Sequence, residues 1–155
     1  MEEEINMISL KFIFGLLIFI LLLHIIATIN SWYWTFTWFD MPMHFLGGFW
    51  LAMVFMWLNP NFQIQNPKFI KLPNYLITGI ITLGFVILVG VFWEFFEFLC
   101  DVFLFGASYF QKGAIDTIKD LFFDLLGGLI FLVIYKYFLK SNDAKSQQNK
   151  DYFPE

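Results

Sequence analysis

The sequence predicts an all-α integral membrane protein built as a four-transmembrane-helix bundle. Hydrophobic residues make up 59% of the 155-residue chain and charged residues only 14%, which is too few for the charged surface of a soluble domain of this size. Four apolar runs are long enough to cross a bilayer as helices, although the second is near the short limit. We expect the helices at about residues 8–29, 42–58, 75–99 and 116–139, within one transmembrane domain over 1–139.

The first helix follows an acidic N-terminus. Met1–Glu4 carries three glutamates where a secretory signal peptide has positive charge, and the apolar run Leu10–Ile29 is too long for a signal core. This run is therefore expected to remain as the first span. Ser31–Phe39 follows with three tryptophans and a tyrosine, and such amphipathic rings favour the membrane–water interface.

Prolines and polar stretches separate or end the later helices. Pro42 suits the first turn of the second helix, because its missing N–H would have had no partner there. Three prolines make Asn59–Asn74 the clearest loop, and Val102–Ala114 is expected to be a Phe-rich connection near the interface. Lys140–Glu155 is polar and lacks periodicity, so it is predicted to be a disordered cytoplasmic tail.

The placement of the lysines predicts the orientation. With four spans, both termini and the loop Asn59–Asn74 lie on the same side of the membrane. That side holds Lys11, Lys68, Lys71, Lys136, Lys140, Lys145 and Lys150, and only Lys112 and Lys119 belong to the other side. The positive-inside rule then predicts a multi-pass protein of the cytoplasmic (inner) membrane with both termini in the cytoplasm.

Ionisable residues form narrow stripes at the outward ends of three helices. Residues four positions apart drift only about 40° around a helix axis and so share one face. The stripes are Asp40 and His44 on the second helix, Glu94, Glu97 and Asp101 on the third, and Asp116, Asp120 and Asp124 on the fourth. We expect the shared faces of Glu94 and Glu97, of His44, and of Asp120 and Asp124 to converge in one outward-opening cavity.

Residues 40–48 (DMPMHFLGG) and 120–128 (DLFFDLLGG) echo each other and are identical at four of nine positions. Such an echo fits two helical-hairpin repeats with a site between them. The four shared positions hold residue types that are common in membrane helices, so coincidence is the alternative. The glycines below each polar stripe would let helix backbones approach closely.

Three motifs carry a resemblance to known families. They are DMPMH at 40–44, WEFFE at 93–97, and DTIKDL at 116–121 followed by Gly127. They resemble the motifs of the uncharacterised YjdF-like bacterial inner-membrane proteins over about Trp38–Leu139. More distantly they are similar to the VanZ-like superfamily, with Glu97 where Gln is usual and Asp124 where Asn is usual. The resemblance implies a multi-helix cell-envelope protein, and VanZ-like members are associated with glycopeptide resistance.

Carboxylates clustered beside a histidine suit a divalent cation such as Mg²⁺, Mn²⁺ or Zn²⁺. Either a cation or protons must neutralise like charges this close together. The first hypothesis is therefore a metal-dependent enzyme acting on an envelope lipid or a polyprenyl phosphate, although no arginine or P-loop is present to clamp phosphate. The candidate metal ligands are Asp40, His44, Glu94, Asp120 and Asp124, and the candidate catalytic residues are Glu94, Glu97 and Asp120.

Two other hypotheses stay open. Carboxylate–histidine chains in membranes serve as relays, so the protein is alternatively an ion or proton carrier, and a homodimer would widen its thin pathway. It is alternatively a structural or partner-binding protein with acids bonded across helices. Asp101 and Asp116 are expected to be solvated, His24 to be an interhelical hydrogen-bond partner, and Cys100 to be a buried, inert thiol. No basic patch points to nucleic acid, and no motif points to an organic cofactor.

Overall fold

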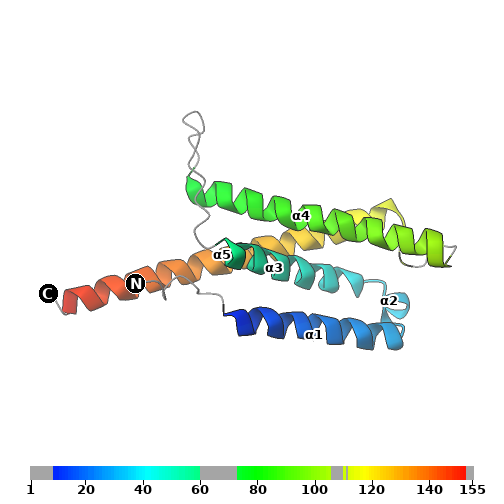
Figure 1. The fold of residues 1–155 in the computed structure, drawn as a ribbon, viewed down its shortest axis with the longest axis horizontal. Coiled ribbons are helices and arrows are strands. Elements are labelled where there is room, and N and C mark those ends of the chain that lie inside the picture. The colour runs from blue at the N-terminus through cyan, green and yellow to red at the C-terminus, as the bar shows by residue number, and fades with distance from the viewer. Residues whose placement is uncertain (1–8, 60–72, 106–109, 111, 153–155) are drawn as a thin grey trace.

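The computed structural model describes residues 9–59, 73–105, 110 and 112–152, with side chains described up to residue 138 except at 105. Every regular element in this part of the chain is a helix (Figure 1). The elements are α1 (Leu10–Ile29), α2 (Trp32–Thr35), α3 (Asp40–Leu58), α4 (Asn74–Cys100), a π-helical turn (Asp101–Phe105) and α5 (Ala114–Tyr152).

Three helices are long and apolar enough to cross a membrane by their length and composition. They are α1, α3, and α4 continued through its π-helical turn to Leu104. The predicted all-helical class is thus confirmed, and at least three of the predicted spans have the length they need. α5 is not among these three, and its first turns carry Asp116, Lys119 and Asp120.

The structure corrects the prediction for the C-terminal stretch. α5 continues as a helix to Tyr152, whereas a disordered tail was expected from Lys140. Extending an existing helix gains one hydrogen bond per residue without a new nucleation step, and lysine, glutamine and alanine are good helix formers. A polar stretch without apolar periodicity is therefore helical here because it continues a helix that already exists.

The boundaries of α3 and α4 also differ from the predicted ones. α3 begins at Asp40, two residues earlier than expected, which places Asp40 in its first turn. The predicted connection Val102–Ala114 begins instead as the π-helical turn. The Asp101 carboxylate accepts hydrogen bonds from the Phe110 N–H at 2.9 and 3.1 Å and so ties the chain back to the end of α4. The proline-rich loop falls on 60–72, outside the described residues.

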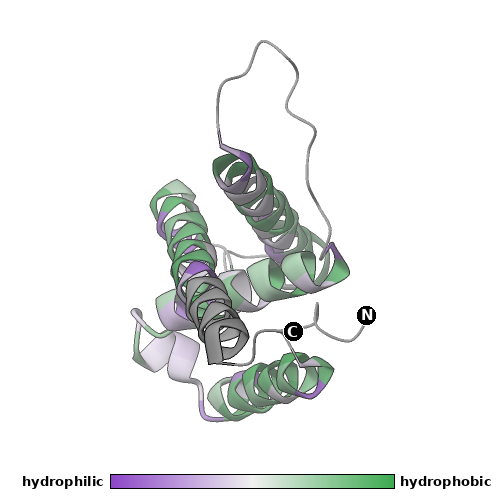
Figure 2. Ribbon diagram, turned by 90° about the vertical axis from the view of Figure 1, so that its left-hand side faces the viewer, coloured by the Kyte–Doolittle hydropathy of each residue, from purple (hydrophilic) through white to green (hydrophobic). Residues whose placement is uncertain are grey.

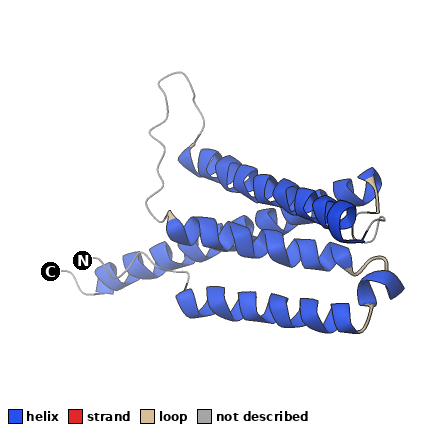
Figure 3. Ribbon diagram, turned by 45° about the vertical axis from the view of Figure 1, so that its right-hand side comes forward, coloured by secondary structure: helices blue, strands red, loops and turns tan. Residues whose placement is uncertain are grey.

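α3 is the central helix of the bundle, with α1 on one side of it and α4 on the other (Figures 1 and 3). α3 and α5 run in the same direction, and α1 and α4 run in the opposite one. The most extensive packing is between α3 and α5, whereas α1 packs mainly against α3. Apolar residues colour most of the length of the helices (Figure 2), and many large hydrophobic side chains are exposed on their outer faces, as expected for surfaces in contact with lipid.

Glycines bring α3 and α5 into backbone contact. A Cβ atom at Gly48 would overlap the carbonyl oxygen of Asp124, and one at Gly127 would overlap the carbonyl oxygen of Phe45. Small residues permit such close approach between membrane helices. Away from this crossing, toward the C-terminal end of α3, the buried core is apolar and includes Ile13, Ala52, Met53, Met56, Val86 and Phe131.

Candidate functional site

The site lies at the end of the bundle that holds α2 and the starts of α3 and α5, on the right in Figure 1. α3 and α5 enter the bundle there with Asp40 and Asp116 in their first turns, and α4 leaves it after Glu97. A cavity of about 340 Å³ opens at this end, and side chains from α1, α3, α4 and α5 line it.

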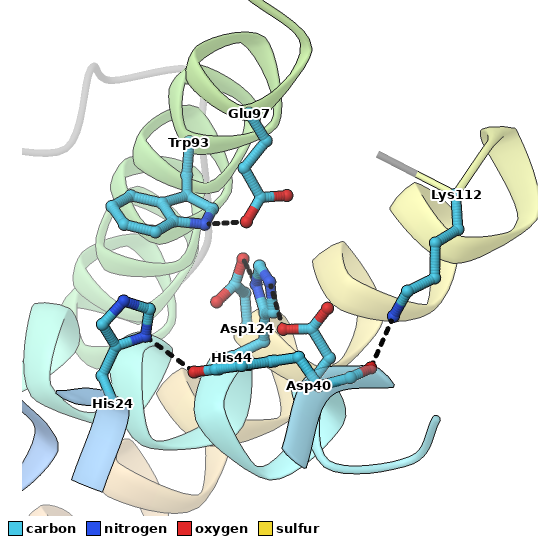
Figure 4. A network of polar contacts seen from close by, with 8 residues as sticks. His24, Asp40, His44, Trp93, Glu97, Lys112 and Asp124 are labelled. Atoms are coloured by element: carbon cyan, nitrogen blue, oxygen red, sulfur yellow. Dashed lines mark hydrogen bonds and ion pairs between the residues drawn. The ribbon is translucent and has the colours of Figure 1, made fainter. Parts of the chain in front are cut away.

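His44 on α3 is the centre of the polar contacts (Figure 4). Its ring is buried, with 7% of the residue exposed. Its Nδ1 lies 3.3 Å from Oδ2 of Asp124 on α5, and its Nε2 lies 3.8 Å from Oδ1 of Asp40 one turn earlier on α3. The imidazole is therefore held between two carboxylates that approach its two nitrogens separately.

Glycine on a third helix makes room for this arrangement. A Cβ atom at Gly90 of α4 would overlap Oδ2 of Asp124, the same oxygen that meets His44. Asp124 itself is buried, with 4% exposed. Three helices thus meet at the Asp124 carboxylate. α5 carries Asp124, α3 carries its partner His44, and α4 carries Gly90, whose missing side chain leaves room for the carboxylate.

Three side chains are arranged as metal ligands are. Asp40, His44 and Asp120 each offer one ligand atom, and these atoms all lie within 4.8 Å of one another. His44 and Asp120 are buried, and Asp40 is partly buried. Of the five ligands predicted from the sequence, the structure groups these three, places Asp124 against Nδ1 of His44, and leaves Glu94 outside the group.

The glutamates of α4 take different positions. Glu97 lines the cavity, and its Oε1 accepts a hydrogen bond of 2.9 Å from Nε1 of Trp93. Glu94 is buried, with 6% exposed, and is not part of the cavity wall. Asp120 is also buried outside the wall. Of the residues expected to converge, His44, Glu97 and Asp124 line one cavity together with Asp40, while Glu94 and Asp120 are not in its lining.

Other expectations for single residues have mixed outcomes. His24 bonds through Nδ1 to the Tyr33 hydroxyl at 2.7 Å, which confirms its predicted role as a hydrogen-bond partner between helices. Asp101 was expected to be solvated, which is wrong: it is 5% exposed and binds the Phe110 N–H. Cys100 was expected to be buried, and it is only partly buried.

Tyr33 and Lys112 lie at the mouth of the cavity, and the sequence did not predict a role for either of them there. Tyr33 was assigned only to the membrane interface, yet it bonds His24 and lines the cavity with Lys112. Lys112 Nζ donates to the Tyr33 carbonyl oxygen at 3.3 Å across 79 residues of sequence. Burial, and then the negative charges of Asp40 and Glu97, raise the pKa of the Tyr33 hydroxyl, so it stays protonated at neutral pH. No spacing pattern connects Tyr33 with Lys112, so only the fold reveals this contact.

Comparison with known proteins supplies a family but no function. No curated protein and no solved structure matches the chain. The resemblance to YjdF-like proteins is consistent with the family found, whereas a relationship to the VanZ-like superfamily is not shown. The family model described as "Predicted membrane protein (DUF2238)" matches residues 6–141, and the chain belongs to that family.

Proposed function

We propose that the protein is a membrane enzyme that uses one divalent cation, held by Asp40, His44 and Asp120, to act on a lipid-linked phosphate. The observation that carries this proposal is the geometry around His44. Three ligand atoms from two helices lie within 4.8 Å of one another. A fourth residue, Asp124, contacts Nδ1 of His44, which leaves Nε2 for the cation.

The contact with Asp124 supports the assignment of His44 as a ligand. A histidine that binds a metal usually donates its other ring N–H to a carboxylate or carbonyl group, which fixes its tautomer and orientation. An ionised Asp124 can only accept a hydrogen bond, so a neutral His44 that binds a cation would carry its proton on Nδ1 and offer Nε2, which lies 3.8 Å from Oδ1 of Asp40, to the cation. Asp124 is then a positioning residue rather than a ligand.

The donor set fits a divalent cation. Two carboxylates and one imidazole suit Zn²⁺ or Mn²⁺, with the remaining positions left for water or substrate. Ligand atoms about 2.0–2.2 Å from a tetrahedral cation lie about 3.3–3.6 Å apart. Since the three atoms lie within 4.8 Å of one another, side-chain movements of up to about 1.5 Å would close them around a cation.

The neighbouring side chains suggest roles for the chain in phosphate chemistry. A bound cation would polarise the phosphate and favour attack at phosphorus. Glu97 faces the cavity and is the better of the two glutamates to take a proton from an attacking water, because Glu94 lies behind the wall. As the water oxygen bonds to phosphorus, the bond between phosphorus and the lipid oxygen would break, and the proton held by Glu97 would pass to the leaving alcohol. Lys112 supplies a positive charge at the cavity mouth, where it would pair with a phosphate oxygen.

The apolar half of the bundle favours an enzyme over an ion or proton carrier. The buried ionisable side chains among the described residues are His44, Glu94, Asp101, Asp120 and Asp124, all near one end. Toward the other end the core consists of apolar side chains, with Thr82 as its buried polar member. A relay across the membrane needs successive polar groups, which this core does not offer. A purely structural role would not require a cavity beside the buried acids.

The proposal includes an arrangement in the membrane. α5 crosses the bilayer as the fourth span, both termini lie in the cytoplasm, and the site opens to the outer side of the cell membrane. The lysine distribution supports this orientation, and the parallel course of α3 and α5 in Figure 1 fits it. The echo of 40–48 in 120–128 also fits, since its fifth positions are His44 and Asp124, which meet.

Metal analysis of the purified, full-length protein tests the proposal. After supplementation with Zn²⁺ or Mn²⁺, we expect about one cation per chain, and Asp120→Asn should lower the content at least about tenfold because a charged ligand is lost. Asp116→Asn is the matched control. It makes the same substitution on the same helix outside the three-residue group and should leave the metal content unchanged. Wild-type protein that stays metal-free, or equal losses in both variants, would refute the site.

A further inference from the structure

One face of α3 forms the floor of the cavity, and α1 and α4 form its two walls. The residues of this floor recur at helical spacing along α3 and are Asp40, Met43, His44, Gly47, Trp50 and Leu51. From Asp40 to Leu51 the helix rises about 16 Å. The cavity is therefore an elongated trough rather than a compact pocket, and we call it the α3 trough.

All three helices of the α3 trough change from polar to apolar in the same direction. On α3 the change runs from Asp40 to Leu51, and on α4 it runs from Glu97 to Val89. On α1 it runs from His24 to Leu17. α1 and α4 run against α3 (Figure 1), so these gradients agree in space although they are reversed in sequence. The trough is polar at the end with the metal site and apolar toward the bilayer centre.

No helix of the described part of the chain covers the long side of the α3 trough between α1 and α4. α1 packs extensively only against α3 and α2, and Figures 1 and 2 show it set apart from α4 with α3 between them. An alkyl chain already in the membrane could therefore enter the trough sideways without leaving an apolar environment.

We propose that the α3 trough binds one alkyl chain of a phosphate-headed amphiphile, with its head group at Lys112 and the metal site. This inference rests on the proposed function and names its substrate class. The volume of about 340 Å³ lies at the lower end of the range of about 300–1,000 Å³ for ligand pockets, which suits one chain rather than two.

Charge decides which head group the polar end accepts. Asp40, Glu97 and Asp124 face the cavity, and Lys112 is the one lysine among the described residues that lines it. Without a cation these carboxylates would repel a phosphate. A divalent cation between Asp40, His44 and Asp120 would offset the charges of the two aspartates, and a phosphate would then have two positive partners, the cation and Lys112. Binding of the amphiphile should therefore depend on the metal.

Binding of dodecyl phosphate to the detergent-solubilised, full-length protein, followed by native mass spectrometry with and without Mn²⁺, tests this inference. We expect a one-to-one complex in the presence of Mn²⁺ that inorganic phosphate at the same concentration does not displace. Ile20→Trp would place a bulky ring in the α1 wall and should weaken binding by about tenfold or more, because the chain and the ring compete for space. Leu22→Trp, on the exposed face of the same helix, should bind as the wild type does.

The possible outcomes separate this inference from the proposed function. If the wild type binds Mn²⁺ but not dodecyl phosphate, or if Ile20→Trp and Leu22→Trp bind equally, the trough assignment is wrong and the metal site stands. Mn²⁺ content also reports whether Ile20→Trp is folded. If the protein binds no Mn²⁺ yet holds dodecyl phosphate in an Ile20-dependent way, the metal proposal and the metal-bound head group fail, and the assignment of the trough to an alkyl chain stands. Tighter binding of dodecyltrimethylammonium than of dodecyl phosphate would overturn the phosphate head group.

Discussion

His44 and Asp124 lie 80 residues apart in the sequence, yet Nδ1 of the first meets Oδ2 of the second at 3.3 Å in the interior of the bundle. They sit on α3 and α5, which Gly48 and Gly127 bring into backbone contact just beyond them. The contact fixes the orientation of the imidazole, and the proposed metal site depends on that orientation.

Asp124→Asn should weaken metal binding without removing a ligand. The amide keeps the shape of the side chain but is a poorer acceptor for the Nδ1 proton, so His44 becomes less basic and less well oriented. Changes to such supporting residues typically cost about 10–100-fold in metal affinity. Competition titration with a fluorescent Zn²⁺ chelator would measure the loss. An affinity unchanged from wild type would show that Asp124 does not support His44.

Gly90→Ala, a change on α4, should displace the Asp124 carboxylate and so weaken metal binding at the proposed site on α3 and α5. The new methyl group would overlap Oδ2 of Asp124, and relieving the overlap moves the carboxylate away from His44. Overpacking of this kind costs about 1–3 kcal/mol of stability, and we expect metal affinity to fall with it. Thermal unfolding in detergent and the chelator titration would measure both effects.

Gly84→Ala is the control for Gly90→Ala. It lies on the same helix with no atom within 4 Å of the added methyl group. Replacing a glycine inside a helix with alanine there should be neutral or stabilise by up to about 1 kcal/mol. If both alanine variants behave alike, the contact between Gly90 and Asp124 has no part in the site.

Tyr33 should make the stability of the folded protein depend on pH in the alkaline range. Its pKa is raised above the ordinary value of 10.0, chiefly by burial. The folded state therefore holds the phenolic proton more tightly than the unfolded state does. The corresponding stability is fully present below pH 10 and is lost as the pH rises above it. The melting temperature of the wild type should fall between pH 9 and pH 11 by more than that of Tyr33→Phe. Parallel curves would show that Tyr33 does not titrate in this way.

The orientation can be checked with single cysteines in a Cys100→Ser background. Ser31→Cys, before α2, should react with a membrane-impermeant maleimide in intact spheroplasts, because that end of the bundle is proposed to lie outside. Asn59→Cys, at the end of α3, should react only after the membrane is opened. The reverse pattern would place the cavity on the cytoplasmic side.

Helical periodicity predicts which polar residues share a face but not which faces touch. The stripe of Asp40 and His44 follows from their spacing and the start of α3, and the structure preserves it. That His44 would meet Asp124 rather than Glu94 depends on the glycine crossing of α3 and α5. The overlap of Gly48 with the backbone of Asp124 sets this register, and no property of one helix determines it.

For the two glutamates of α4, too, helical spacing does not predict what each side chain contacts. Glu94 and Glu97 lie three residues apart on one face, so their spacing predicts the same role for both. The two side chains point about 60° apart around the helix axis, and in the packed bundle Glu97 borders the cavity while Glu94 is buried outside its lining. The length of α5 was misjudged for a different reason, since helix continuation depends on the helix before it rather than on the local sequence.

The pairing of α3 with α5 has a consequence for how the protein is made. A ribosome adds about 5–20 residues per second, so Asp124 is synthesised about 4–16 s after His44. During that interval α3 has entered the membrane with Asp40 and His44 but without the helix that later encloses them. Polar side chains exposed to hydrocarbon are costly, and α4 arrives first without a carboxylate partner for the Nδ1 of His44. Assembly in the membrane therefore waits on the last helix, and a chain truncated before Asp120 would leave α3 a target for membrane quality-control proteases.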